Sequence, residues 1–457
     1  MSTPSSELGL ARVVRQGVLT LTAYATVVAS GFMIGIGGVA STAGPLGMVS
    51  YWVAGGLSTF ATAMVFGELA AMFPRSGGIW EYTKQVFGND HPVSYMVGWM
   101  YWFALAFGLN VEIVSAGYYT NWLLPQVPQW VGGLFVVAVF LALNFFGIKL
   151  SSAIEGLFGL ILILSFSVFI LFGLFHINPT LYANFAPNGT ILPFLKTLPY
   201  VVIAFCGFEI VTTMAEESVH PEKHIPRALL GAATFLTVLF GAFSVIAFGL
   251  VPWNKWSLYT STTAPLLSIG SAVLGTLGLA WLSLQSYAGS LSTINGGVIG
   301  QVRMLYAMAR EGWFPKSFAR IHPKYRVPEI PLWITGVSMV FIALLPMISN
   351  TAWTWAAFLG VFGYAVIYIL AAGLLIYLRV ARPDLPRPYR APFYPVTPLI
   401  VILAFGATLY FSGKEVFFIG VAWALAGIAV YFLVGRPLRR QWRSENGATT
   451  TGTGANV

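Results

Sequence analysis

Two glutamates lie deep inside long apolar stretches of the sequence and are the first candidates for chemistry. Glu209 follows the segment Phe205-Cys206-Gly207-Phe208, and Glu112 lies in the apolar stretch 93–120. A charged side chain at the centre of an apolar membrane helix costs about 2.5–3.5 kcal/mol on insertion scales, so such carboxylates are candidates for function. We interpret Glu209 as functional because it adjoins a glycine that can interrupt a helix. For Glu112, a carboxylate hydrogen-bonded to neighbouring helices is an equally good interpretation.

Two further glutamates lie near the ends of apolar stretches. Glu68 is six residues before Pro74, and Glu155 opens the stretch 153–175. We interpret both as carboxylates at the membrane interface, each paired with a basic residue in a loop.

Glycines interrupt two of the apolar stretches near their middle. The first stretch contains SGFMIGIGG (30–38), and the sixth contains Gly207 two residues before Glu209. Glycine is about 0.8–1.0 kcal/mol less favourable than alanine inside a helix, so these segments can unwind. Glycine-interrupted stretches at corresponding positions of two halves of a transporter indicate its binding site. For 30–38, close helix packing through small residues is the alternative.

The remaining reactive residue types exclude several classes of function. None of the five histidines lies inside an apolar stretch, which argues against histidine catalysis or a histidine-bound metal in the membrane. The chain has no G-x-x-x-x-G-K-S/T sequence, so we expect no ATP hydrolysis. Cys206 is the single cysteine, and we expect it to line a pocket rather than act as a nucleophile. The sequence therefore predicts a protein that is not an enzyme and has no cofactor or metal site.

The elements that must position these residues are membrane helices. The 457-residue chain is 57% hydrophobic and only 9% charged, whereas soluble domains carry about 25% charged residues. Its 24 Lys and Arg against 15 Asp and Glu give a net charge of +9, which in a soluble protein would suggest nucleic acid binding. Here the bases lie in short loops between apolar stretches. We therefore expect a multi-pass membrane protein surrounded by lipid, with no nucleic acid partner.

The pattern predicts an all-α protein with twelve transmembrane helices. A membrane-crossing helix needs about 20 mostly apolar residues. Such stretches lie at 18–43, 46–72, 93–120, 128–147, 153–175, 193–217, 227–251, 264–299, 331–349, 352–378, 397–413 and 416–434.

The positions of the bases predict the orientation of the chain. Cytoplasmic loops hold an excess of Lys and Arg. With both termini in the cytoplasm, all sixteen arginines and five of the eight lysines lie on the cytoplasmic side. An odd number of helices would destroy this asymmetry. We expect a multi-pass protein of the cell membrane, organised as a cytoplasmic tail (1–17), a first half (18–175), a second half (193–378), two added helices (397–434) and a second cytoplasmic tail (435–457).

Four segments of the chain resemble the amino acid–polyamine–organocation superfamily of secondary transporters, and the resemblance extends through most of the first ten spans. They are GELAAMFPRSGG (67–78), RMLYAMAREGWFP (303–315), GFE (207–209) followed by AEE (215–217) and IPRA (225–228), and AGP (43–45). Their order and spacing are similar to those of the superfamily.

The resemblance implies a five-plus-five inverted repeat in which helices 1 and 6 are broken and hold the substrate between them. The family's helix 1 Gly-Ser-Gly-Ile-Phe segment aligns with residues 29–33, where Ala29 replaces the first glycine. On this analogy, groups around Ser30 and Gly31 bind a carboxylate, and backbone carbonyls near Phe205 and Cys206 bind an amine. The implied substrate-binding residues are Ala29, Ser30, Gly31, Phe32, Phe205, Cys206, Gly207 and Phe208.

The resemblance also bears on coupling and on the substrate. Some proton-coupled relatives carry a lysine in helix 5, where this sequence has Leu162. Glu209 aligns with a helix 6 glutamate implicated in proton sensing, so we expect Glu209, with Glu112 second, to carry the proton. Exchange without a coupling ion is an alternative, and sodium coupling, with oxygen ligands from Ser290, Ser292 and Thr293, is a less favoured one. The expected substrate is an amino acid, the runner-up is a polyamine or other organic amine, and a channel or receptor with this fold is a further alternative.

Overall fold

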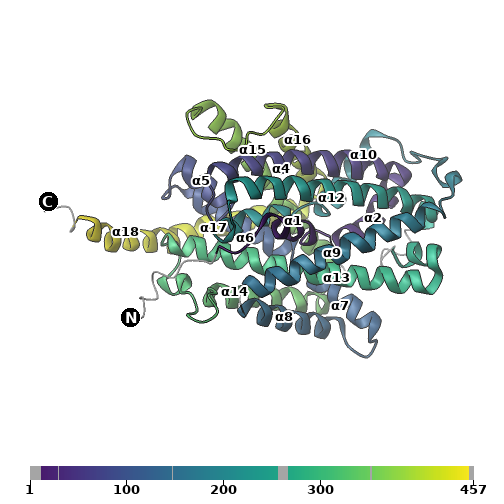
Figure 1. Ribbon diagram of the computed structural model, residues 1–457, viewed down its shortest axis with the longest axis horizontal. Helices are drawn as coiled ribbons and strands as arrows, with labels where there is room; N and C mark the ends of the chain where they lie inside the picture. The colour runs from purple at the N-terminus through teal and green to yellow at the C-terminus, as the bar shows by residue number, and fades with distance from the viewer. Residues whose placement is uncertain (1–11, 29, 147, 256–265, 350–351, 452–457) are drawn as a thin grey trace.

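The structure is a computed structural model that describes residues 12–28, 30–146, 148–255, 266–349 and 352–451. Within these ranges the chain is helical and has no strand beyond two isolated bridges, Val14 with Ser218 and Ile321 with Pro328. Figure 1 shows the long helices lying side by side along the long axis of the molecule.

The described residues of the first part of the chain contain eight α-helices longer than eight residues, joined by turns and short 3-10 or π-helical segments. They are α1 (Gln16–Ala25), α2 (Ser30–Ala43), the 3-10 turn η1 (Gly44–Leu46), α3 (Gly47–Val49), the π-helix η2 (Ser50–Leu57), α4 (Ser58–Met72), α5 (Ile79–Phe87), α6 (Pro92–Gly108), α7 (Glu112–Leu123), α8 (Gln129–Phe145) and α9 (Ile148–Leu174).

The second part begins with short helical pieces and ends in a helix that leaves the bundle. It contains η3 (Pro179–Tyr182), α10 (Ile191–Lys196), α11 (Leu198–Ile203), the 3-10 helix η4 (Phe208–Glu217), α12 (Pro221–Leu250), α13 (Leu266–Arg310), η6 (Lys316–Ala319), α14 (Glu329–Leu344), η7 (Leu345–Met347), α15 (Ala352–Ala381), α16 (Val396–Phe411), α17 (Lys414–Val430), the π-helix η8 (Tyr431–Gly435) and α18 (Arg436–Thr451).

Each of the twelve predicted apolar stretches overlaps one or more of these helices. Nine helical stretches of the described residues are long and apolar enough to cross a membrane, and α8 and α16 are shorter apolar helices. The all-helical, multi-pass architecture is therefore confirmed, while the number twelve and the inverted repeat stay predictions. The helix of the eighth stretch, α13, continues past residue 299 to Arg310 and carries two arginines into the end of the bundle.

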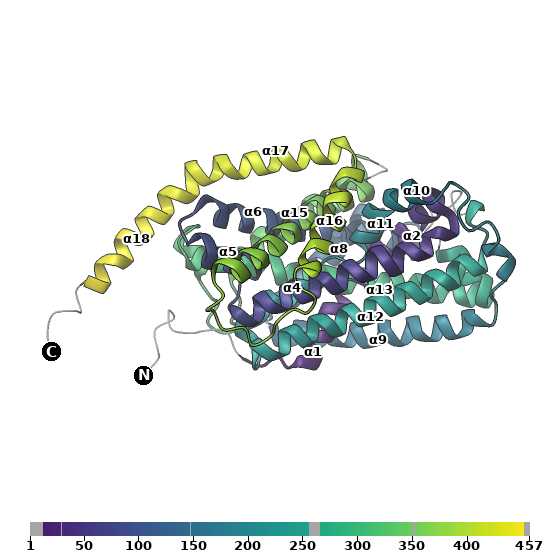
Figure 2. The same ribbon diagram turned by 90° about the horizontal axis from the view of Figure 1, so that it is seen from above.

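Burial separates the central helices from the peripheral ones. In the span formed by α6 and α7, 83% of the most apolar 18-residue segment is buried. In the span formed by α17 and its continuation, only 22% of that segment is buried. Figure 2 shows α17 along one edge of the bundle, with α18 continuing beyond it. Apolar side chains exposed on such an edge, for example Leu433 at 77%, fit contact with lipid rather than water.

The first and last described segments of the chain lie at one end of the bundle. The Val13 and Val14 N–H groups donate to the Glu217 carbonyl at 2.9 and 3.0 Å, and Val219 N–H donates to the Val14 carbonyl at 2.9 Å. The neighbouring Glu216 pairs with Arg310 at the end of α13. Glu311, which follows Arg310, pairs with Arg439 of α18 at 3.6 Å. A continuous set of contacts therefore joins the segment before α1 to the last helix.

Candidate functional site

The first and sixth predicted spans are each interrupted near their middle. In the first, α1 ends at Ala25 and α2 begins at Ser30, with Thr26–Val28 in a turn. In the sixth, α11 ends at Ile203 and η4 begins at Phe208. Helix ends leave backbone N–H and C=O groups without partners in the helix, so each interruption can present such groups to a ligand.

The glycine-rich segment 30–38 is helical, and the prediction that it unwinds was wrong. The interruption instead precedes it, at Thr26–Val28, and the predicted site residue Ala29 lies outside the described residues. A Cβ on Gly35 would lie 3.0 Å from the Tyr200 carbonyl oxygen, and a Cβ on Gly38 would lie 2.5 Å from the Tyr200 ring. These two glycines therefore allow α2 to pack closely on α11. Close helix packing through small residues was the alternative interpretation of this segment, and it is the correct one.

Gly207 is where the sixth span changes direction. Its φ of +105° is in the region that favours glycine, and a Cβ there would lie 2.7 Å from Leu109 Cδ2 and 3.3 Å from the Tyr364 hydroxyl oxygen. Both the backbone conformation and the crowding require a residue without a side chain. The prediction of a glycine interruption in the sixth span is confirmed at this position.

A third interruption lies in the third predicted span and was not expected from the sequence. There α6 ends at Gly108 and α7 begins at Glu112, with Leu109 in contact distance of the Gly207 position. Asn110 is fully buried, and a Cβ on Gly297 of α13 would lie 2.8 Å from its Oδ1. The signal available in the sequence was a glycine followed closely by a polar residue inside an apolar stretch.

Glu209 is fully buried and receives hydrogen bonds from three directions. The Tyr101 hydroxyl donates to Oε1 at 3.2 Å, the Gly207 N–H donates to Oε2 at 3.1 Å, and the Tyr368 hydroxyl also donates to Oε2. Tyr101 belongs to α6 and Tyr368 to α15, so the carboxylate joins η4 to two other helices. Within the described part of the chain, no Lys or Arg forms an ion pair with Glu209. Hydroxyl and N–H donors alone hold it.

Glu112 lies in a separate cluster. It is 2% exposed, begins α7 directly after the third interruption, and accepts a hydrogen bond from the Ser290 hydroxyl of α13 at 2.7 Å. This contact agrees with the interpretation of Glu112 as a carboxylate bonded to a neighbouring helix. The two glutamates share no partner in the contacts described above.

The predicted aromatic site residues face the scaffold helices. Phe32 stacks on Phe240 of α12 with ring centroids 4.2 Å apart and meets Tyr51 of η2 at 5.1 Å. Phe205 meets the same two rings, at 5.2 and 6.4 Å. The side chains of Phe32 and Phe205 thus lock the two interruptions against α12 and η2. What they can offer a ligand is their backbone.

The end of α1 packs against α13. The Ser292 hydroxyl donates to the Ala25 carbonyl at 3.0 Å, and a Cβ on Gly296 would lie 2.4 Å from Thr26 Oγ1. Cys206 and Phe208 are buried at 3% and 1% exposure. The structure places the described site residues of the two spans in one central region, and the side chain of Ser30 lies outside the described residues.

Two ion pairs, one buried and one partly exposed, close the end of the bundle beyond Glu209. Arg303 of α13 makes a two-point contact with Glu217, from Nε at 2.8 Å and Nη2 at 2.9 Å. Arg310 binds Glu216 in the same way, at 3.0 and 2.8 Å, and the Ser76 N–H donates to Glu216 at 3.2 Å. The segments 67–78, 215–217 and 303–315 that carried the family resemblance therefore meet here.

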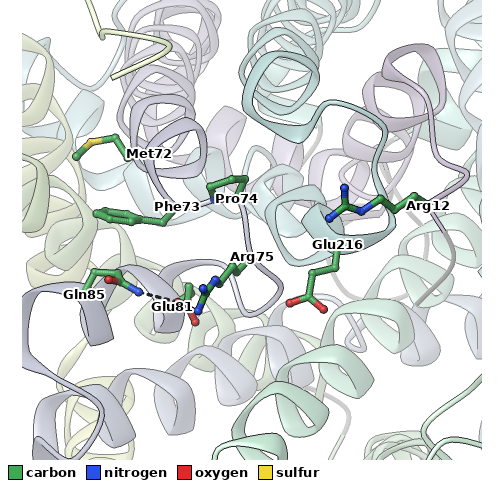
Figure 3. Close-up of a pocket in the computed structure, with 8 residues that line it drawn as sticks. All are labelled: Arg12, Met72, Phe73, Pro74, Arg75, Glu81, Gln85 and Glu216. Atoms are coloured by element: carbon green, nitrogen blue, oxygen red, sulfur yellow. Dashed lines mark hydrogen bonds and ion pairs between the residues drawn. The ribbon is translucent and has the colours of Figure 1, made fainter. Parts of the chain in front are cut away.

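A pocket of about 610 Å³ opens at this end of the bundle. Figure 3 shows Arg75 beside Glu81 with Glu216 across the pocket, and Arg12 of the first described segment completes the rim. The pocket thus presents both signs of charge. It lies at the C-terminal end of η4, the helix that begins next to Glu209.

Glu68 is a structural carboxylate, as the sequence predicted. It is fully buried and accepts from Arg379 Nε at 2.7 Å and from the Ala391 N–H at 2.7 Å, with Arg387 Nε 3.2 Å away. The interpretation as a carboxylate paired with a base is confirmed. The side chain of Glu155 lies outside the described residues. Within the described residues, no group of three or more His, Cys, Asp or Glu could hold a metal.

Comparisons with known proteins agree with this geometry. The model of the family described as amino acid permease matches residues 18–435. The branched-chain amino acid permease BcaP of Bacillus subtilis (strain 168) is 27% identical over 458 residues, covering 94% of this chain and 95% of that protein. A methylthioribose transporter of the same organism is 27% identical over 95% and 96% of the two chains. The amino-acid permease RocE, also from that organism, is 28% identical over 86% and 87%.

Proposed function

Because the chain belongs to the amino acid permease family, we propose that it is a secondary active transporter that moves amino acids across the cell membrane by alternating access. Family membership confirms the resemblance seen in the sequence motifs and makes the protein a multi-pass membrane transporter rather than an enzyme. The observation that carries the proposal is the pair of interruptions in the first and sixth spans, with Glu209 directly after the second.

The substrate is held by backbone groups at the two interruptions. The N-terminus of α2 directs unpaired N–H groups and the positive end of a helix dipole toward the first interruption, which suits a carboxylate. Carbonyl oxygens of the segment between α11 and η4 suit an ammonium group. The residues assigned to substrate binding are Ala29, Ser30, Gly31, Phe32, Phe205, Cys206, Gly207 and Phe208.

Transport is coupled to protons through Glu209. A buried carboxylate that is paired with a cation stays ionised, whereas one held by hydroxyl groups can gain and lose a proton during a cycle. Glu209 is of the second kind, because its donors are Tyr101, Tyr368 and the Gly207 N–H. Glu112, bonded to Ser290, is the second candidate.

The chain is oriented with both termini in the cytoplasm, and its first ten helices form the two inverted halves 18–175 and 193–378. The charge bias of the loops supports this orientation. So does the set of contacts that joins Val14, Glu216 and Arg439 at one end of the bundle. Lipid surrounds the bundle, and neither ATP nor nucleic acid takes part.

Uptake of labelled amino acids into proteoliposomes tests the proposal. A panel of unlabelled amino acids, polyamines and methylthioribose competes with the label, with and without an inward proton gradient. We expect an amino acid to compete best and the gradient to drive accumulation. Failure of every amino acid to accumulate or exchange would overturn the proposal. If only a polyamine or only methylthioribose competes, that compound class is the substrate instead of an amino acid. Single-channel currents would show that the protein is a channel and not a transporter.

The Glu209→Gln variant distinguishes a role of Glu209 in proton coupling from a role in substrate binding. In Glu209→Gln, accumulation under a proton gradient should vanish and the pH dependence of uptake should flatten, while exchange of substrate across the membrane persists. Glu415→Gln is the matched control, because Glu415 is exposed at the start of α17. An unchanged pH profile in Glu209→Gln would assign the proton to another group, with Glu112→Gln as the next variant.

A further inference from the structure

Four arginines lie on one helical face immediately after the last apolar span. Arg436, Arg439, Arg440 and Arg443 belong to α18, at the spacing i, i+3, i+4 and i+7 that places side chains on the same side of a helix. The apolar helix α17 continues through η8 into α18 without a loop. The arginines therefore stand at the level where an apolar span gives way to polar surroundings.

The carboxylates around these arginines neutralise only part of their charge. Arg439 and Arg443 share Asp90, at 2.8 and 2.6 Å. Glu311 contacts Arg439 at 3.6 Å but also binds Lys84 at 3.2 Å. Within the described part of the chain, Arg436 and Arg440 have no ion pair, and both are exposed. Two guanidinium groups are thus available for an anion.

The arginines line a pocket with one apolar edge. The pocket measures about 430 Å³ and is bordered by Trp313, Tyr431 and Phe432 as well as by the four arginines. Phe432, Leu433 and Val434 are 53%, 77% and 45% exposed and lie one turn before the first arginine. Guanidinium groups bind phosphate oxygens in pairs, and the exposed apolar residues suit a hydrocarbon chain attached to that phosphate.

We propose that this pocket binds the headgroup phosphate of an anionic phospholipid, with the acyl chains along the exposed edge of α17 and η8. Clusters of Lys and Arg next to a membrane span attract anionic lipids. Arg436 and Arg440 bind the phosphate, while Asp90 fixes Arg439 and Arg443 and so holds α18 against the bundle. The edge position of α17 in Figure 2 leaves this side open to lipid.

Lipid titration of the purified full-length protein in neutral detergent tests the proposal. Phosphatidylglycerol, phosphatidylcholine and inorganic phosphate are added separately, and binding is measured from the rise in melting midpoint. We expect phosphatidylglycerol to raise the midpoint at concentrations where inorganic phosphate and phosphatidylcholine do not. Arg436→Gln/Arg440→Gln should weaken phosphatidylglycerol binding by about 25-fold. Without added lipid its melting midpoint should stay close to that of the parent, because neither arginine has an ion pair to lose and Arg436 gives up only its contact over the exposed Phe432 ring, 5.9 Å away.

The control variant removes the same charge elsewhere. Arg320→Gln/Lys324→Gln changes two exposed bases of the loop after α13 and should bind phosphatidylglycerol like the parent. An equal loss in this variant would mean general attraction of anionic lipid and would overturn the site. Equal stabilisation by inorganic phosphate would show a site for the free anion, and equal stabilisation by phosphatidylcholine would show that the arginines do not select the headgroup. Either result also overturns the proposal.

Discussion

Replacing Gly207 by alanine should disable transport through two separable effects. A φ of +105° costs a residue with a Cβ about 1–2 kcal/mol. The Cβ would also lie 2.7 Å from Leu109 Cδ2, and overpacking of this kind costs about 1–3 kcal/mol. The sum is about 2–5 kcal/mol against the described conformation. At 1.4 kcal/mol per factor of ten, its population falls at least about 25-fold.

The assay compares initial uptake rates and melting midpoints of matched variants in proteoliposomes. Gly189→Ala is the control for backbone strain, because Gly189 has a φ of +93° with nothing within 4 Å of the added Cβ. It should retain transport and lose only the about 1–2 kcal/mol that the backbone strain costs. Gly207→Ala should lose transport at least tenfold and melt at a lower temperature.

A double variant isolates the crowding. Leu109→Ala removes the atom that the new Cβ would meet, so Gly207→Ala/Leu109→Ala should be less impaired than the two single changes predict together. Simple additivity would show that Leu109 and Gly207 do not act on each other. Parent-like uptake in Gly207→Ala would refute the argument that the sixth span needs glycine at its interruption.

Two further predictions concern the end of the bundle and the packing of the first span. Arg303→Gln leaves the buried Glu217 carboxylate without its cation, so it should destabilise the protein by about 3–5 kcal/mol, measured as a lower melting midpoint. Arg303→Met/Glu217→Met removes both charges and should recover much of that loss. If the double variant recovers no stability, the cost is not purely electrostatic. Gly38→Ala should lower the melting midpoint because its Cβ meets the Tyr200 ring, whereas Gly373→Ala, with open space at its Cβ and a helix interior around it, should raise it slightly.

The sequence alone predicted the apolar helices and the glycine interruption of the sixth span. Apolar length is a strong signal, because backbone groups in lipid must be paired within a helix. The pairing of Glu68 was also predictable, since a carboxylate near a span end requires a base. The interruption at Gly207 was predictable from its place next to Glu209, because a glycine and a charge together are costly in the middle of a membrane helix.

The place of the first interruption was not predictable, and the third had only a local signal, a glycine followed by a polar residue, that does not distinguish a break from a closely packed helix. A glycine lowers helix stability wherever it occurs, but whether it unwinds the helix or admits a neighbour depends on what packs there. Gly38 meets Tyr200, which is 162 residues away in the sequence, and Leu109 meets Gly207 across the fold. Such contacts are set by tertiary packing. No local pattern in either segment records its distant partner.

The backbone contacts before α1 have a consequence for how the family can diverge. Val13, Val14 and Val219 are held by main-chain N–H groups and carbonyls, which every residue except proline provides equally well. Selection on these contacts therefore acts on the absence of proline rather than on a particular side chain. The Val14 side chain is buried in the core, but residues 13 and 219 can change side chain while the tie between the segment before α1 and the end of the sixth span persists.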